Sequence, residues 1–175
     1  WRILGQLRTI LSEPEIAYVR EATTYANAGL DAFFDKARIG MMETELVAEI
    51  DYAMRSAGGD YPAVATWMGT GERAYAQHSS ASHRRLQYGD MAGTEFAGTA
   101  RRYQCQAMGS LVMGEANARM LEIAEGGKAA FALGLAEAKP GGRIGDLEIA
   151  YRAELEGRGL GDCCPMRFGV GLSAA

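Results

Sequence analysis

Apolar residues recur every three to four positions in four segments of the chain, which is the period of an α-helix. The first segment begins with Ser12 as a predicted N-cap residue, has Pro14 in its first turn and is followed by Gly40. We therefore expect a helix over residues 12–37. Its predicted apolar face consists of Ile16, Val19, Tyr25, Ala26, Leu30, Phe33 and Phe34.

The same period predicts three further helices. The second is expected over Glu43–Ser56, ending before the glycine pair 58–59. Two more are expected over 117–138 and 145–158. The predicted apolar face of the second helix consists of Leu46, Val47, Ile50 and Met54.

Residues 59–114, between the two helix pairs, are rich in Gly, Thr and Tyr and contain short apolar runs typical of β-strands. Strands are expected over 63–68, 90–97 and 103–113. The last two are expected to be joined by a hairpin turn at 98–101. This order of elements is typical of an α+β fold with a mostly antiparallel sheet.

The chain also resembles itself. Residues 37–58, "ARIGMMETELVAEIDYAMRSAG", align without gaps with residues 138–159, "AKPGGRIGDLEIAYRAELEGRG". Two unrelated amphipathic helices can share such a pattern, but the glycines at matching positions on both sides favour a duplication. The halves would then be 12–114 and 115–175. The second half has no matching strand block, so roughly 40 residues of sheet are expected to be missing from this chain.

Composition excludes several classes of function. The chain has 175 residues, 48% of them hydrophobic, and a formal net charge of −4, which suits one globular domain. Nucleic acid and membrane are not expected as partners, because a basic patch or a run of roughly 18 apolar residues would be needed. An odd number of cysteines and the lack of a leader favour a reducing, cytoplasmic location. Two histidines without a CxxC motif do not make a zinc cage.

Glu95 is a lone carboxylate in the predicted strand 90–97. A buried charge is costly unless a partner neutralises it or the chemistry uses it. One hypothesis is an ion pair with Arg101 or Arg102 across the hairpin, and the other is a role in catalysis. His78 lies in a serine-rich loop, where a solvated histidine is the ordinary expectation.

Five segments resemble the creatinase/aminopeptidase family, whose members have the pita-bread fold of two pseudo-symmetric halves. "SEPEIAYVREA" (12–22) resembles the start of the family's catalytic domain, and "GTGERAYAQHSSASHRRLQYGD" (69–90) its histidine-containing segment. "FGVGLS" (168–173) lies where a loop with glycine and histidine is usual. "GGDYPA" (58–63) and "EFAGTARRYQC" (95–105) resemble the metal-independent creatinase-like branch, ectoine hydrolases in particular.

The resemblance also implies an organisation for the whole protein. Residues 1–11 would be a linker from an N-terminal domain that this sequence lacks, and residues 12–175 a truncated pita-bread domain. The chain is therefore expected to be a fragment. Family members are homodimers, so a homodimer is expected for the intact protein.

Metal-dependent aminopeptidases of this family hold two divalent ions with two Asp, one His and two Glu. The resemblance places the first Asp position on Glu95, the second on Gln106 and the His on Phe168, with both Glu positions beyond residue 175. An amide is a poor ligand, a phenyl ring is none, and one carboxylate does not hold two dications. The sequence therefore predicts neither a metal ion nor another cofactor.

Instead, the resemblance implies a metal-independent hydrolase that cleaves a C–N bond of a small cyclic or amidino amino acid, similar to ectoine or creatine. His78 matches a histidine used as general acid and base, and Glu95 matches a carboxylate that attacks or stabilises the reacting carbon. The residues expected to bind the substrate are Tyr61, Arg102, Gln104, Gln106 and Phe168.

Two alternatives remain open, because the chain departs from the family's motifs. An Arg-Thr pair is usual where this chain has Gly109–Ser110, and the ectoine branch has a histidine where this chain has Gln104. One alternative is a metal-dependent Xaa-Pro-type aminopeptidase with a degenerate site. The other is a catalytically inactive family member that acts as a binding module.

Overall fold

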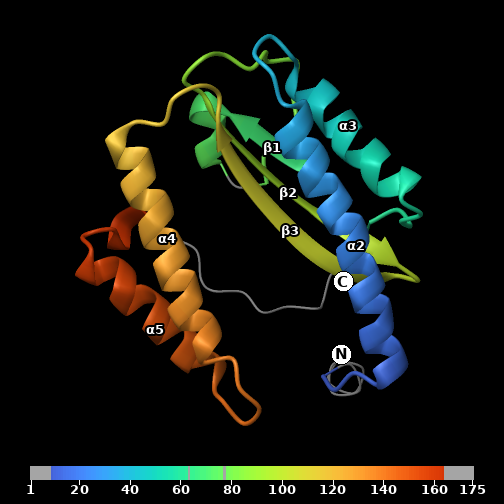
Figure 1. The fold of residues 1–175 in the computed structure, drawn as a ribbon, viewed down its shortest axis with the longest axis vertical. Helices are drawn as coiled ribbons and strands as arrows, with labels where there is room; N and C mark the ends of the chain where they lie inside the picture. The colour runs from blue at the N-terminus through green and yellow to red at the C-terminus, as the bar shows by residue number, and fades with distance from the viewer. Residues whose placement is uncertain (1–8, 63, 77, 164–175) are drawn as a thin grey trace. The chain divides into compact units, whose positions relative to one another are not determined.

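The computed structural model describes residues 9–62, 64–76 and 78–163. In chain order, the described elements are helices α2 (Glu13–Lys36) and α3 (Glu43–Ser56), strand β1 (Trp67–Thr70), the 3₁₀ turn η1 (Gly71–Tyr75), strands β2 (Met91–Ala100) and β3 (Tyr103–Val112), helices α4 (Ala118–Ala136) and α5 (Ile144–Gly157), and the 3₁₀ turn η2 (Gly161–Cys163) (Figure 1). These elements form two compact units, of which one ends at Glu115 and the next starts at Ala116. The architecture is α+β, as predicted.

Helix α2 begins where the sequence predicts. The side chain of Glu15 accepts hydrogen bonds from the backbone N–H and the hydroxyl of Ser12, which occupies the N-cap position. The buried stripe runs through Ala22, Ala26 and Phe33. Phe34 was expected on this face but is 52% exposed, because it is one residue beyond the buried Phe33 and each residue along a helix turns the side chain by about 100°.

The three strands form an antiparallel sheet in the order β1-β2-β3. Two strand predictions need correction. The first strand covers Trp67–Thr70 rather than 63–68, and just before it the Thr66 hydroxyl donates a hydrogen bond to Asp51 on α3. The hairpin turn lies at Arg101–Arg102, both with positive φ, rather than at 98–101.

Gly98 is the reason that the turn was predicted too close to the N-terminus. It lies inside β2, where α2 crosses the sheet so closely that a Cβ atom on residue 98 would lie 2.2 Å from the carbonyl oxygen of Ala22. This glycine is therefore required for close packing of helix on strand rather than for a turn.

Helices α2 and α3 cover one face of the sheet (Figure 1). The core of the first unit lies between these helices and the sheet. Successive strand residues point to opposite faces, so Phe96 enters this core and Glu95 points away from it. The buried side chains of this core are Phe33, Leu46, Ile50, Met54, Met68, Leu86, Ala92, Phe96 and Met113.

The second unit is a helix pair, with bounds within two residues of the prediction. Asn117 caps α4, because its side-chain oxygen accepts a hydrogen bond from the Met120 N–H at 2.9 Å. Ala130, Leu155 and Leu160 form a small buried cluster between the helices and the turn that follows them. Among the described helices of the chain, none is long and apolar enough to cross a bilayer.

Candidate functional site

Glu95 lies in the middle of β2, on the face of the sheet opposite α2 and α3. The strand register pairs it with Trp67 on β1 and with Met108 on β3. Its side chain is 19% exposed. Glu95 is therefore a partly shielded carboxylate on a rigid central strand.

His78 reaches Glu95 from the segment that follows β1 and η1. Its Nε2 atom lies 3.3 Å from Oε2 of Glu95, and its side chain is 50% exposed. The backbone of His78 has φ = 59°, which is a left-handed conformation that costs free energy in a residue other than glycine. The structure thus places the two residues predicted to be catalytic next to each other.

Trp67 is the residue of this site that sequence reasoning missed. Its indole ring stacks on the imidazole of His78, with 3.9 Å between ring centroids and 29° between the planes. Trp67 was assigned only to a strand, because the register that places it beside Glu95 cannot be read from the sequence. The stacked indole fixes the plane of the imidazole and shields one of its faces from water.

Two polar side chains of β3, Gln104 and Gln106, lie on the same sheet face as Glu95. Gln106 pairs with Ala97 and is exposed, and it lies two residues from Met108, which pairs with Glu95. Such diagonal neighbours lie about 7–8 Å apart on an antiparallel sheet, within reach of a long side chain. Gln104 pairs with Thr99 and is buried. Gln106 is therefore placed to contact a molecule bound at Glu95.

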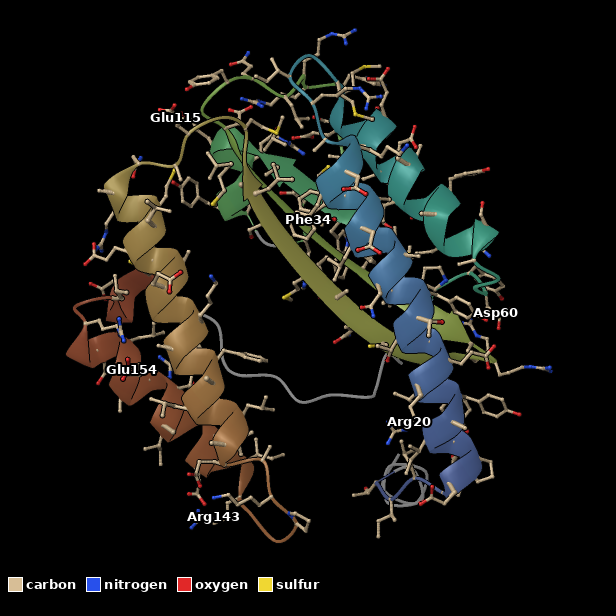
Figure 2. All side chains as sticks on the ribbon, in the orientation of Figure 1. Arg20, Phe34, Asp60, Glu115, Arg143 and Glu154 are labelled. Atoms are coloured by element: carbon tan, nitrogen blue, oxygen red, sulfur yellow. The ribbon has the colours of Figure 1, made fainter. Side chains whose placement is uncertain are left out.

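Tyr61 and Arg102 form a separate group at the hairpin turn. The guanidinium of Arg102 lies over the Tyr61 ring at 4.6 Å and donates a hydrogen bond to the Tyr61 carbonyl oxygen. The backbone N–H of Arg101 donates to Asp60, which lies beside the turn (Figure 2). Glu95 is six residues from this turn along β2, or about 20 Å at roughly 3.3 Å per residue. The structure therefore does not bring Tyr61 and Arg102 to the His78–Glu95 pair.

The turn geometry also excludes the ion pair considered for Glu95. Arg101 and Arg102 occupy the turn itself, whereas Glu95 faces Trp67 and Met108 in the ladder. The hypothesis that either arginine pairs with Glu95 is wrong, because the side chain that lies against the Glu95 carboxylate is that of His78. Phe168, the remaining predicted contact, lies outside the described residues.

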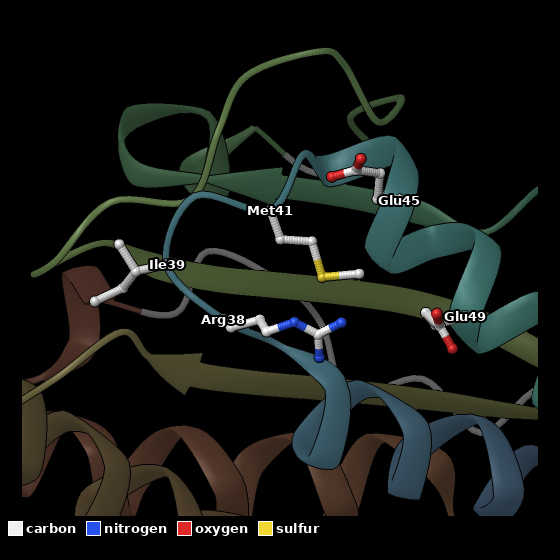
Figure 3. A pocket seen from close by; sticks show the side chains of 5 residues that line it. All are labelled: Arg38, Ile39, Met41, Glu45 and Glu49. Carbon is white, nitrogen blue, oxygen red and sulfur yellow. The ribbon is translucent and has the colours of Figure 1, made fainter.

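A shallow pocket of about 300 Å³ lies elsewhere, at the turn between α2 and α3 (Figure 3). Arg38 and Glu49 line it together with three neighbours, and neither of the two predicted catalytic residues does. This pocket therefore adds nothing to the candidate site.

The chain is similar to peptidases in both sequence and structure. The chain matches the model of metallopeptidase family M24 over residues 17–174. The Xaa-Pro dipeptidase of Pyrococcus furiosus is 27% identical over 172 residues, which cover 97% of this chain and 49% of that protein. The Xaa-Pro dipeptidase of Pyrococcus horikoshii is 26% identical over 170 residues, with 97% and 48% covered. The chain spans about half the length of these relatives.

Solved structures share the fold. A prolidase from Pyrococcus furiosus matches with a TM-score of 0.87 and 27% identity over 92% of this chain and 48% of that one. An X-Pro aminopeptidase from Thermotoga maritima matches with a TM-score of 0.86 and 25% identity over 92% and 46%. These matches confirm the predicted pita-bread fold class. The named relatives are Xaa-Pro peptidases, so the comparisons do not support the finer assignment to the ectoine branch.

A metallopeptidase model raises the question of whether the described residues fit a metal ion. Across residues 9–62, 64–76 and 78–163, no three His, Cys, Asp or Glu side chains gather closely enough to hold one. The hairpin offers the carboxylate of Glu95 and, diagonal to it, the neutral amide of Gln106. Divalent ions in two-metal sites require several carboxylate oxygens. The described part of the chain does not by itself fit such a site.

Proposed function

This chain belongs to metallopeptidase family M24, and we propose that it carries the proton-transfer residues of a hydrolase that cleaves a C–N bond in a small amino-acid derivative. The observation that carries the proposal is the 3.3 Å approach of His78 Nε2 to Glu95 Oε2 on the sheet face opposite α2 and α3, where the Trp67 ring stacks on the imidazole. An imidazole beside a carboxylate is a common acid–base arrangement.

In such a hydrolysis, the oxygen of water bonds to the carbon of the C–N bond, the C–N bond breaks, and the leaving nitrogen takes a proton. His78 accepts the proton from water as a neutral imidazole and passes it to the leaving nitrogen as an imidazolium. A positioned group of this kind accelerates such reactions by about 10²–10⁴. Half of the His78 side chain is exposed, so substrate and water have access to it.

Glu95 stabilises the charge that His78 gains. A carboxylate beside the ring attracts the positive charge that forms during proton transfer and keeps the ring oriented. Its partial burial strengthens this attraction, because screening by water is reduced there. The distance to the imidazole favours this role over a direct attack by Glu95 on the substrate carbon.

The relatives favour an Xaa-Pro dipeptide as the substrate. In this bond, the leaving nitrogen becomes a secondary amine, which is a strong base and needs the proton that His78 supplies. Gln106 lies on the same sheet face and offers a donor and an acceptor for the peptide group.

A second candidate is a cyclic or amidino amino acid, similar to ectoine or creatine. It is favoured by Gln106, because a reaction that uses only proton transfer does not need a second carboxylate on the hairpin. Both candidates assign the same roles to His78 and Glu95, and they differ in substrate and in their need for metal.

The test incubates the protein with an Xaa-Pro dipeptide, creatine and ectoine, with and without a strong chelator, and follows products by NMR. Cleavage of the dipeptide supports the first candidate, and turnover of creatine or ectoine that survives the chelator supports the second. In either case, Glu95→Gln is expected to lose all turnover. Glu49→Gln removes the same charge from α3 and serves as the control, which is expected to keep its turnover. No turnover of any of the three, or full activity of Glu95→Gln, would contradict the proposal.

A further inference from the structure

Glu43, in the first turn of α3, is a charged residue with no exposed surface. Its Oε1 accepts hydrogen bonds from the Thr70 N–H at 2.9 Å and the Thr70 hydroxyl at 2.7 Å. Its Oε2 accepts from the Ser82 N–H at 2.8 Å and the Ser82 hydroxyl at 2.6 Å. One buried carboxylate thus holds two points of the chain that are twelve residues apart in sequence.

The surroundings of this carboxylate favour its charged form. Burial acts to raise the pKa of Glu43, but the hydrogen bonds from Ser82 and Thr70 outweigh burial and lower its pKa below the usual value. Arg73 adds a positive charge with its Nε 3.5 Å from Oε2. A fixed charge with four donors is a strong anchor, because bonds to an ionised acceptor are roughly twice as strong as neutral ones.

The two anchored points bracket the segment that carries His78. Thr70 is the last residue of β1, and Ser82 follows the serine-rich loop. Between them, Arg73 donates from Nη2 to the Ser80 carbonyl at 2.6 Å, and Ser80 forms an isolated bridge with Trp67. Glu43 therefore reaches both ends of the segment directly and its middle through Arg73.

We infer that Glu43 is a positioning residue, which holds residues 71–76 and 78–81 in the conformation that keeps the His78 imidazole against Trp67 and Glu95. The inference rests on the proposed role of His78. It accounts for how a non-glycine residue with positive φ is held in place, since an exposed loop without anchors would relax from that conformation.

A carboxylate is required at this position for geometric reasons. Glutamine has the same length, but its NH₂ group would face either the two donors of Thr70 or the two donors of Ser82, so one side of the anchor is lost. Aspartate is one CH₂ group shorter and does not span both sites. Arg84 also contacts Thr70, but it cannot replace Glu43. It donates a hydrogen bond to the Thr70 hydroxyl oxygen, so removal of the carboxylate would still leave the Thr70 N–H without its acceptor.

The first measurement does not depend on activity. The chain has two histidines, so their ring protons are assigned in the NMR spectrum by comparing His78→Gln with His83→Gln. Ring current from the stacked Trp67 shifts the His78 signal away from that of the exposed His83. In Glu43→Gln, the His78 signal is expected to move towards the position of the His83 signal, and in Glu49→Gln it is expected to stay in place.

The second measurement is turnover of the substrate found in the screen. Glu43→Gln is expected to lower kcat by about 10- to 100-fold with little change in KM, because a displacement of about 1 Å of a catalytic group costs on that order. Ser82→Ala removes one of the four donors, so it is expected to shift the His78 signal and to lower kcat in the same direction, by smaller amounts. This variant decides the matter if Glu43→Gln does not fold.

The outcomes separate this inference from the proposed function. An unchanged His78 signal in folded Glu43→Gln, or in Ser82→Ala, would overturn the positioning role. A shifted His78 signal with unchanged kcat would support the positioning of His78 but would overturn its use in catalysis. A shifted signal together with a lowered kcat supports both.

Discussion

Gly98 offers a direct test of the packing that holds Glu95 in place. A methyl group at this position would lie 2.2 Å from the Ala22 carbonyl oxygen and 2.4 Å from the Ala26 nitrogen. Both are backbone atoms of α2, so no side-chain rotation relieves the clash. Ordinary contact begins near 3.4 Å, so in Gly98→Ala the helix must move away from the sheet by roughly 1.2 Å, the difference between 3.4 and 2.2.

The magnitude follows from that movement. A gap of 0.5–1 Å forfeits about a quarter to a half of each van der Waals contact, and α2 packs on the sheet through Gly29, Phe33 and their neighbours. Overpacked core positions cost about 1–3 kcal/mol. Since the obstructing atoms are backbone, we expect Gly98→Ala to lie near the upper end, at about 3 kcal/mol in the free energy of unfolding.

Gly93 provides the matched control, because it lies on the same strand and a Cβ atom there would meet nothing within 4 Å. Gly93→Ala is expected to leave the free energy of unfolding unchanged or to raise it by about 0.4–1 kcal/mol. Urea unfolding of both variants, followed by circular dichroism, measures the difference. Equal midpoints for Gly98→Ala and Gly93→Ala would refute the close approach of helix and strand.

Three further predictions concern stability. Phe96→Ala empties a fully buried site in the core and is expected to cost about 3–5 kcal/mol in urea unfolding; a cost below about 1 kcal/mol would contradict its burial. Asn117→Ala removes the cap of α4 and is expected to cost about 1 kcal/mol, seen as earlier thermal loss of helical signal, whereas an unchanged melting curve would contradict the cap. The hydrogen bond from Arg84 lowers the pKa of Asp90 below its usual value of 3.8, so this pair contributes stability above about pH 4 that is lost as the pH falls through the lowered pKa. The difference in stability between wild type and Asp90→Asn should therefore be largest near neutral pH and shrink in acid, and a difference independent of pH would contradict this linkage.

The helices were predictable because their signals are local. Apolar period, N-cap residue and following glycine lie within a few positions of each other, and the bounds of all four helices agree with the structure to within about two residues. The prediction that Phe34 is buried was wrong, because the width of the buried face of a helix depends on what packs against it. The pita-bread fold was recognisable from motifs rather than from period.

The strands were harder, because glycine has two opposite uses. Gly98 reads as a turn residue in the sequence, but here it allows a helix to approach a strand. The two arginines that do form the turn give no turn signal, because this geometry is most often occupied by Asn-Gly.

The site was predictable only in part. His78 and Glu95 were identified by resemblance, and the structure places them 3.3 Å apart, while their role stays a prediction. Trp67 depends on strand register, and Glu43 resembles any acidic residue that favours the start of a helix. The partners of Glu43 lie 27 and 39 residues further along the chain, so no local pattern indicates its burial.

The central claim is that His78 transfers the proton, and its most direct test compares the two histidines of the chain. The measurement is kcat/KM for the substrate found in the screen, in His78→Gln and in His83→Gln, across a range of pH. Our account predicts a loss of about 10²–10⁴ in kcat/KM for His78→Gln at every pH tested, and no loss for His83→Gln, which is exposed. Equal activity of the two variants would contradict the account.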